Sequence, residues 1–364
     1  MLKIITRFLL SILTGANVAT IALMLAVGFS DRINPAVHPT LGCLGMFFPF
    51  TIAANMLFLL LWLFIKWKRA WIPLAGFALA YVPIRTYVPL HPKAQSAEGP
   101  TIKVISYNVM AYSYEKQPNL DTICQWLEQE KPDIVCLQED MKTGSGEPFE
   151  RLKTMFEYND TVHVNDVTQS YINAVGIHTR YPLLRTEIIA YDSKNNGSAA
   201  FFLLVDGDTV IVINNHLEST HLTPTDRQRY KDVIKGDMER DSARQETRLL
   251  INKISSQMAL RAPQADIIHE WIERHSQYPI IVCGDFNDTP ISYVRRTIAK
   301  GLTDCFVEAG NGPGLSYNQK GFFFRIDHIM CSKNYLPVSC HVDTKIHASD
   351  HFPLVCTLKN VDKP

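Results

Sequence analysis

The stretch IIVCGDFN (280–287) begins with four consecutive apolar residues, which are followed by a glycine and then by Asp285 and Asn287. A short apolar run bounded by turn-forming residues is typical of a strand that is buried on both faces of a sheet. Asp285 and Asn287 follow the apolar part almost directly. The stretch therefore predicts a protein built on buried strands, with polar side chains presented where the strands end.

Seven other runs of this kind alternate with amphipathic stretches along the chain. These further predicted strands are KVISYNV (103–109), DIVCLQE (133–139), AVGIHT (174–179), AAFFLLV (199–205), TVIVINNHL (209–217), RIDHIMC (325–331) and PLVCTL (353–358). Helices are predicted at residues 120–130 and 266–275, and a charged helical insertion at residues 230–258. Many strands with a few helices indicate an α+β fold, a four-layer α/β/β/α sandwich of two packed mixed sheets.

Polar residues recur at the ends of these strands. They are Asn108, Glu139, Asn214, Asn215, His216, Asp285, Asn287 and Asp327, with Ser349, Asp350 and His351 just before the last strand. Taken singly, an Asn or Asp at a strand end is an ordinary turn residue, and a lone histidine is more often structural than functional. The ordered set, rather than any one member, points to a common cleft.

Six short motifs carry a resemblance to a known family. They are YNV (107–109), LQE (137–139), NNHL (214–217), GDFN (284–287), RIDH (325–328) and SDH (349–351), in that order. The series resembles that of the endonuclease/exonuclease/phosphatase superfamily over residues 102–358. RAPQADIIHEWI (261–272) is similar to a stretch common in its sphingomyelinase-like and membrane-linked bacterial branch. The resemblance implies a membrane-anchored, divalent-metal-dependent hydrolase of phosphate esters.

The resemblance also implies roles for the metal-binding and water-activating residues. Glu139 would be the leading ligand of Mg²⁺ (or Mn²⁺), with Asp350 and Asn108 as further candidates, because hard cations prefer oxygen ligands. Asp285 would orient or deprotonate the attacking water. Phosphate diesters repel nucleophiles, so such a site must both neutralise phosphate oxygens and activate water.

The remaining implied roles belong to groups that would contact the phosphate. Asn287, Asn108 and His216 would contact its oxygens. His351 would donate hydrogen bonds to the phosphoryl group as an imidazolium, and Asp327 would pair with His351 and fix its orientation. His216 and Asp327 are therefore counted with Asp285 and His351 as catalytic. Ser349 is interpreted as a turn residue and not as a nucleophile.

Two positions depart from the family pattern. Met110 stands where apurinic-site endonucleases carry an acidic residue, two positions after the first-strand asparagine, and a thioether cannot ligate Mg²⁺. This disfavours a repair-type nuclease and leaves the other branches open. His178 lies within a predicted strand and is interpreted as structural.

The first ninety residues predict a membrane region. Three apolar stretches, at residues 4–29, 41–65 and 70–90, are each near the roughly 20 residues that span a bilayer core. The third contains Pro73, Pro83 and Arg85, and a helix lying in the membrane interface is its alternative. We therefore expect a membrane region at residues 1–92 with about three transmembrane helices, a linker at 93–100 and a catalytic domain at 101–364.

The distribution of basic residues predicts the orientation. Lys3 and Arg7 mark the amino end as cytoplasmic, and residues 66–69 mark the second loop as cytoplasmic too. An odd number of spans then places the catalytic domain outside the cytoplasm, on a multi-pass protein of the inner or plasma membrane.

Charge and cysteine content bound the function further. Eight basic residues and one acidic residue precede residue 95, which leaves 28 basic and 35 acidic residues after it and a net charge of −7. Such a domain lacks the overall positive field that usually captures nucleic acid. Eight cysteines occur without a C-x-x-C pair, so buried free thiols are expected and a zinc site is not.

The expected partners are the bilayer and a phosphate-ester substrate, which is a lipid headgroup, a nucleotide or a nucleic acid. No protein partner is predicted. Two alternatives remain open at this stage. One is an extracellular nuclease of the same fold, and the other is a non-enzymatic membrane receptor or scaffold with a degenerate hydrolase domain.

Overall fold

The computed structural model describes residues 2–91, 99–114, 117–141, 147–164, 173–220, 222–319 and 322–361. Most of the predicted linker lies outside these residues, as do His221 and parts of the loop 141–170.

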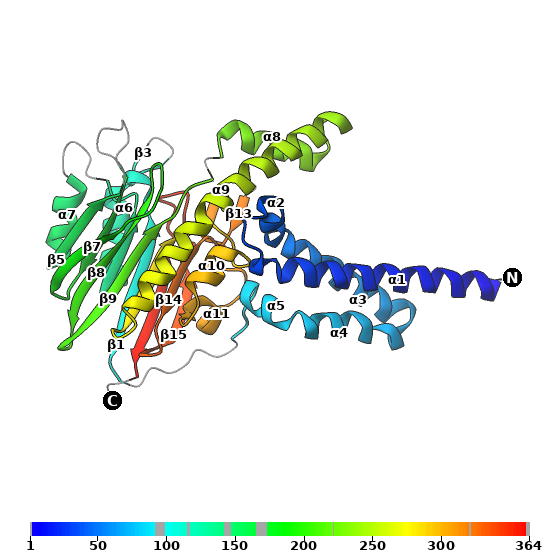
Figure 1. Ribbon diagram of the computed structural model, residues 1–364, viewed down its shortest axis with the longest axis horizontal. Coiled ribbons are helices and arrows are strands. Elements are labelled where there is room, and N and C mark those ends of the chain that lie inside the picture. Colours follow the sequence, from blue (N-terminus) through cyan, green and yellow to red (C-terminus); the bar gives the residue numbers. More distant parts are fainter. Residues whose placement is uncertain are drawn as a thin grey trace.

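Two six-stranded sheets form the centre of the predicted catalytic domain (Figure 1). The first runs in the order β15 (Tyr335–Val342), β16 (Leu354–Asn360), β1 (Thr101–Asn108), β4 (Ile134–Gln138), β6 (Ala174–Thr179) and β5 (Tyr158–His163). The second runs in the order β11 (Thr303–Asp304), β14 (Asp327–Cys331), β10 (Ile280–Asp285), β9 (Asp208–His216), β8 (Gly197–Val205) and β7 (Leu183–Ile189). Each sheet is mixed, since β1 and β4 pair in parallel, as do β9 and β10, among antiparallel neighbours.

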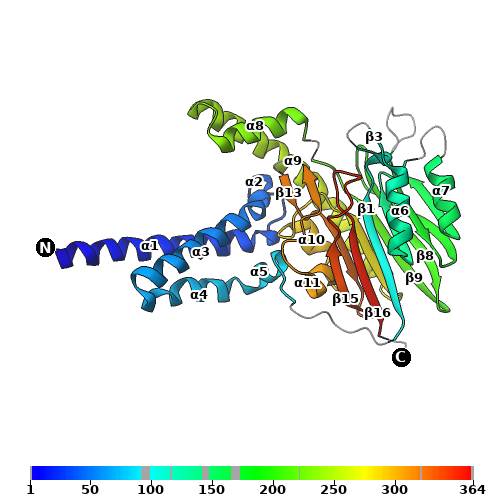
Figure 2. The same cartoon turned by 180° about the vertical axis from the view of Figure 1, so that it is seen from behind.

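The two sheets pack face to face, and helices cover their outer faces. Apolar residues of both sheets, such as Val104, Ile177, Phe201 and Ile281, are buried together between them. On the outer face of the first sheet lie α6 (Leu120–Glu130) and α7 (Glu147–Met155), and on that of the second lie α9 (Arg240–Arg274) and α10 (Tyr293–Ile298). Figures 1 and 2 show α9 and α6 from opposite sides. The predicted α+β four-layer sandwich is confirmed.

All eight predicted strands occur, but three longer strands were not predicted. These are β5, β7 and β15, each at or near the edge of a sheet. Edge strands bury only part of their surface, and β7 carries Arg185 and Glu187 among its apolar residues. Their sequences therefore lack the continuous apolar run that marks a central strand.

Several short elements complete the catalytic domain. They are η4 (Met110–Tyr112), β2 (Ser113–Tyr114), β3 (Gln117–Pro118), α11 (Cys305–Ala309), β12 (Tyr317–Gln319) and β13 (Phe322–Phe324). All eight cysteines of the chain are buried, as expected.

The charged insertion forms two helices, α8 (Pro224–Lys235) and the first half of α9. A capping box of Thr223 and Asp226 starts α8, and Gly236 ends it in the left-handed conformation. The sequence predicted a separate helix at residues 266–275, but α9 is continuous through Pro263. Proline removes one backbone donor, yet buried residues on both sides, such as Ala262 and Ala265, keep the helix packed on the sheet.

The amino-terminal residues form a bundle of helices that projects from the sandwich (Figure 1). Its elements are α1 (Leu2–Gly28), η1 (Ser30–Arg32), α2 (Pro39–Gly42), η2 (Cys43–Phe47), α3 (Phe48–Ile65), η3 (Trp67–Arg69), α4 (Trp71–Leu79) and α5 (Tyr81–Tyr87). Two helical stretches, Lys3–Arg32 and Pro39–Ile65, are long and apolar enough to cross a membrane. The third predicted span consists of α4 and α5, which break at Ala80, so three spans stay a prediction.

Buried amides join the first two long helices. Asn17 of α1 donates to Asn55 Oδ1 of α3 at 3.3 Å, and Trp62 Nε1 donates to Asn17 Oδ1 at 3.0 Å. Amide pairs between helices are typical of membrane bundles, in which an unpaired polar group is costly.

The helical bundle also contacts the catalytic domain directly. Arg85 pairs with Glu308 at 2.7 Å, and the Gly312 amide donates to Pro89 O at 2.9 Å. Gly45 of η2 lies so close to the loop after β10 that a Cβ there would stand 1.8 Å from the carbonyl oxygen of Ile291. The helices therefore pack against the same end of the sandwich that carries the polar strand ends.

Candidate active site

Neighbouring strands bring the predicted site residues together. Because β9 and β10 are parallel, their carboxyl ends meet at one edge, and Asp285 lies opposite His216. The antiparallel β14 starts at the same edge and sets Asp327 opposite Asp285 on the other side. Asn108 ends β1 of the facing sheet, and Glu139 follows β4 beside it.

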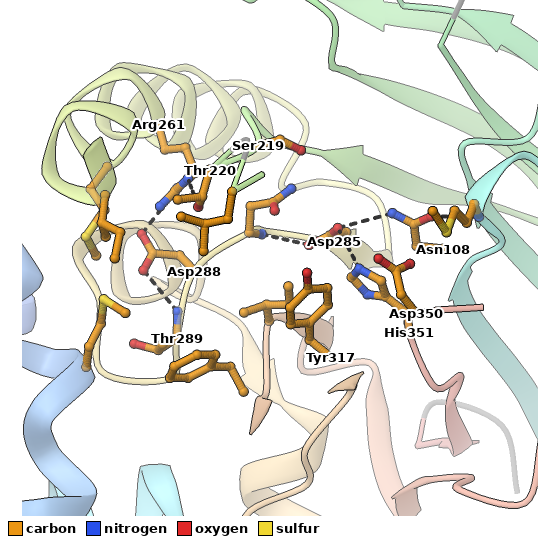
Figure 3. Close-up of a pocket in the computed structure, with 18 of the residues that line it drawn as sticks. Asn108, Ser219, Thr220, Arg261, Asp285, Asp288, Thr289, Tyr317, Asp350 and His351 are labelled. Carbon is orange, nitrogen blue, oxygen red and sulfur yellow. Dashed lines mark hydrogen bonds and ion pairs between the residues drawn. The ribbon is translucent and has the colours of Figure 1, made fainter. Parts of the chain in front are cut away.

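Three of these residues, Asn108, Glu139 and Asp285, line a cavity of about 400 Å³ (Figure 3). Asn108, Asp285, Asp350 and His351 gather at one end, while Arg261, Asp288 and Thr289 lie at the other. Glu139 and Asn287 also line the cavity, whereas His216 and Asp327 lie behind the lining residues.

His351 is held between two buried carboxylates. Its Nδ1 lies 2.9 Å from Asp327 Oδ2, and its Nε2 lies 3.6 Å from Asp285 Oδ2. Burial alone would lower the pKa of His351, but the charges of Asp327 and Asp285 outweigh it and raise the pKa to about 10. The ring is therefore an imidazolium at neutral pH, with one N–H fixed by Asp327 and the other directed toward Asp285.

Asp285 is the carboxylate at which most of these contacts meet. Its Oδ1 accepts the Asn287 amide at 2.8 Å, and its Oδ2 accepts from Asn108 Nδ2 at 3.3 Å. Burial raises the pKa of Asp285 to about 6, with His351 opposing the rise and Asp327 adding to it. A carboxylate with this pKa can take up a proton near neutral pH.

Glu139 and His216 form the adjoining part of the site. Asn108 Nδ2 donates to Glu139 Oε1 at 3.2 Å, and His216 Nε2 stands 4.0 Å from the same oxygen and 3.8 Å from Asp285 Oδ2. Asn173 Nδ2 lies 3.1 Å from His216 Nδ1 and is a donor, so the proton of the neutral ring belongs on Nε2. Burial lowers the pKa of His216, which keeps it neutral.

Backbone strain marks two of the site residues. Glu139 has φ of 54° and Asn287 has φ of 53°, a left-handed conformation that non-glycine residues rarely adopt. Such strain is concentrated at functional sites, where the surrounding structure must hold it. Asn287 is held by its own side chain, whose Nδ2 donates to Leu217 O at 3.0 Å.

Two residues of the last motif have different surroundings. Asp350 is half-buried at the cavity, and its carbonyl accepts the Asn318 amide at 2.8 Å. Ser349 is buried and donates through Oγ to Asn108 O at 2.7 Å, so it ties the last motif to the end of β1. This contact agrees with its interpretation as a turn residue.

The oxygen donors of the cavity suit a hard divalent cation. Glu139 and Asp350 offer carboxylate oxygens at one end, whereas the Oδ1 of Asn108 accepts the Met110 amide at 3.0 Å. Asp285, Asp327 and His351 also place one potential ligand atom each within 4.8 Å of one another. However, His351 uses both nitrogens on carboxylates and is protonated, and a metal-bound imidazole must be neutral. The first set is therefore the better metal site.

Sequence reasoning missed several residues that line the cavity. Tyr317 packs edge-on against His351, with ring centroids 5.1 Å apart, and its hydroxyl accepts from Arg227 Nη1 at 3.0 Å. Arg261 is buried, donates to Glu218 O at 2.9 Å and lies 3.5 Å from Asp288 Oδ2. The sequence offered a signal only for Arg261, which opens the stretch at 261–272 that is similar to the membrane-linked branch.

Comparison with models of known protein families identifies the family of the chain. A family model described as "Endonuclease/Exonuclease/phosphatase family" matches residues 105–351. The chain belongs to this family. It is therefore a phosphoric ester hydrolase of the endonuclease/exonuclease/phosphatase type, and the enzyme prediction is confirmed. Family members use divalent metals, and the residues above accommodate one.

The amino-terminal helices match a different model. Residues 10–87 match one described as a domain of unknown function (DUF8431). No curated protein sequence matches the chain.

Solved structures share the fold at low identity. A humanized D. rerio TDP2 with 14 mutations is 18% identical, with a TM-score of 0.50 over 71% of this chain and 99% of that one. The human Nocturnin catalytic domain with bound sulfate is 18% identical, with a TM-score of 0.51 over 73% and 97%. A Leptotrichia buccalis family protein is 15% identical, with a TM-score of 0.50 over 71% and 99%. At this identity the likeness establishes the fold alone.

Proposed function

We propose that this family member is a membrane-tethered, divalent-metal-dependent phosphodiesterase or phosphatase. The observation that carries the proposal is the ring of His351, which Asp327 holds against Asp285 in the wall of a cavity that Glu139 also lines. A positive donor, a base and carboxylate oxygens that can hold a cation are three groups that favour hydrolysis of a phosphate ester.

Each residue has a separate task in this proposal. Asp285 takes a proton from the attacking water, whose oxygen forms the new bond to phosphorus as the bond to the ester alcohol breaks. His351 donates a hydrogen bond to a phosphoryl oxygen, and Asn287 and Asn108 hold further oxygens. His216 Nε2 lies 3.8 Å from Asp285 Oδ2 and 4.0 Å from Glu139 Oε1, and its proton would contact a phosphate oxygen.

Glu139, with Asn108 and Asp350, would hold Mg²⁺ or Mn²⁺. The bound cation would supply positive charge to the phosphate oxygens, which four nearby carboxylates would otherwise repel. Asp327 acts through His351 and is a positioning residue.

We further propose that residues 1–92 anchor the enzyme in the inner or plasma membrane, with residues 101–364 as the catalytic domain outside the cytoplasm. The two long apolar helices and the buried amide pair between them support an anchor. The basic residues at both cytoplasmic ends support the orientation.

The test is hydrolysis of bis(p-nitrophenyl) phosphate by the full chain in detergent. We expect turnover with Mg²⁺ or Mn²⁺, its loss with EDTA, and at least a 100-fold loss of kcat/KM in Glu139→Gln and in His351→Gln. The matched control is His347→Gln, since His347 lies on the same loop but is exposed. Equal rates with and without chelator, or full activity of His351→Gln, would refute the proposal.

A further inference from the structure

A second, mostly apolar cavity of about 570 Å³ adjoins the catalytic cavity. It lies between η2 and α3 of the helical bundle on one side and α8, α9 and β13 of the catalytic domain on the other. Met46, Ile254 and Phe324 line both cavities, so the two lie side by side. We call this second cavity the apolar groove.

The apolar groove opens on the side of the molecule from which the helical bundle projects. Figures 1 and 2 both show α8 and the first turns of α9 extending from the sandwich in the same direction as α1 and α3. Three phenylalanines that line the groove are well exposed, Phe47 by 45%, Phe50 by 64% and Phe323 by 51%. Clustered exposed aromatic side chains beside a membrane anchor would meet the bilayer.

The charges of the apolar groove disfavour a polyanion. Its two cationic lining residues are each paired with a carboxylate, Arg229 with Glu246 at 3.1 Å and Lys253 with Asp226 at 2.6 Å. Nucleic acid needs cations available for its phosphates, whereas a hydrocarbon chain needs apolar walls and no charge.

We propose that the substrate is a membrane phospholipid. Its phosphate ester reaches the catalytic cavity while one acyl chain lies in the apolar groove, so the lipid enters from the bilayer without leaving it completely. This inference rests on the proposed hydrolase function and adds the substrate class to it. The adjacency of a polar and an apolar cavity with three shared lining residues carries it, because one amphipathic molecule could place its polar part in one and its apolar part in the other.

The test compares two esters that release the same chromophore. One is bis(p-nitrophenyl) phosphate, and the other is dioleoyl phosphatidyl-p-nitrophenol in mixed micelles, both with Mg²⁺ and the full chain. We expect kcat/KM for the lipid ester to exceed that for the water-soluble ester at least ten-fold. A chain that hydrolyses the water-soluble ester but shows no preference for the lipid overturns the lipid inference and leaves the hydrolase standing. A chain inactive on both esters overturns the proposed function, and the lipid inference falls with it.

Variants in the groove separate the two sites. Phe323→Glu and Phe47→Glu should each lower turnover of the lipid ester at least ten-fold and change that of the water-soluble ester less than two-fold. The matched control is Leu260→Glu, since Leu260 is 44% exposed on α9 and lies outside the groove lining. Equal losses on both esters, or none on either, would overturn the inference.

A binding measurement does not depend on turnover or on folding of the variants. The unaltered chain is irradiated with a phosphatidylcholine that carries a diazirine in one acyl chain, and the labelled peptides are identified by mass spectrometry. We expect label on residues of η2, α8 and α9 that line the groove. Label confined to the outer faces of α1 and α3, or plasmid DNA cleaved faster than the lipid ester, would contradict a lipid chain in the groove.

Discussion

The side chain of Asn214 joins the two sheets directly behind the active site. It is fully buried, its Nδ2 donates to Leu137 O at 2.8 Å and to Gly176 O at 2.9 Å, and its Oδ1 accepts from Gln138 at 2.7 Å. Asn214 belongs to β9, whereas its three partners belong to β4 and β6 of the facing sheet. We therefore expect that Asn214→Leu, which keeps the branched shape but removes the amide, destabilises the catalytic domain.

The size of the effect follows from the bonds that are lost. A buried carbonyl left without its donor costs about 1–3 kcal/mol, so the two carbonyls together cost about 2–6 kcal/mol. The larger apolar side chain offsets up to about 2 kcal/mol of this through burial, and we expect a net loss of about 2–4 kcal/mol. At roughly 2–4 °C per kcal/mol for a domain of this size, Tm should fall by about 4–16 °C.

Thermal unfolding of the full chain in detergent measures the shift. Because Gln138 precedes Glu139 directly, the same substitution should also lower kcat/KM and weaken Mg²⁺ binding. Asn252→Leu is the matched control, since Asn252 is exposed on α9, and surface changes usually stay within about 0.5 kcal/mol. An Asn214→Leu protein with Tm within about 2 °C of the unaltered chain would refute the view that this amide joins the sheets.

Three other predictions test the site and the packing of the helical bundle. Asp327→Asn should lower the pKa of His351, because it removes the carboxylate that raises this pKa most. The imidazolium is then lost at lower pH, so the alkaline limb of the pH–rate profile should move down by at least one pH unit. We expect kcat/KM to fall roughly 10²–10⁴-fold. Gly45→Ala should lower the free energy of unfolding by about 1–3 kcal/mol, because the new Cβ would clash with Ile291 O, and the loss should be measured as a lower Tm. Gly15→Ala is the control and should leave Tm unchanged, because there is open space around Gly15. Mg²⁺ at a hundred times its Kd should stabilise the EDTA-treated chain by about 2.7 kcal/mol, and no rise in Tm would contradict a metal site in the folded state.

The central strands and the site positions at their ends were predictable because a strand that is buried on both faces has a simple sequence pattern. β10 and β4 are buried on both faces, so each appears as a continuous apolar run with polar residues directly after it. The edge strand β5 (YNDTVH) lacks this pattern, because only Thr161 of its six residues is buried.

Contacts between distant segments were not predictable. Tyr317 reaches His351 because the β12–β13 hairpin folds over the site, and Arg227 reaches Tyr317 from α8, ninety residues earlier in the chain. Neither the residue types nor their spacing in the sequence predicts such a contact. Asn214 is the clearest case, since a turn residue and a buried bond between sheets look the same in sequence.

The balance of charge at the site explains why its parts must work together. Glu139, Asp285, Asp327 and Asp350 lie around one cavity end, and among them His351 is the group held positive by its neighbours. A phosphate would be repelled by this set unless positive charge is added. Asp285 must be ionised to take the proton of the attacking water, and a pKa of about 6 leaves it ionised above that pH yet able to accept the proton. A divalent cation at Glu139 would supply the positive charge, so metal binding and substrate binding should be thermodynamically linked, with substrate affinity rising with Mg²⁺ concentration until the site is saturated.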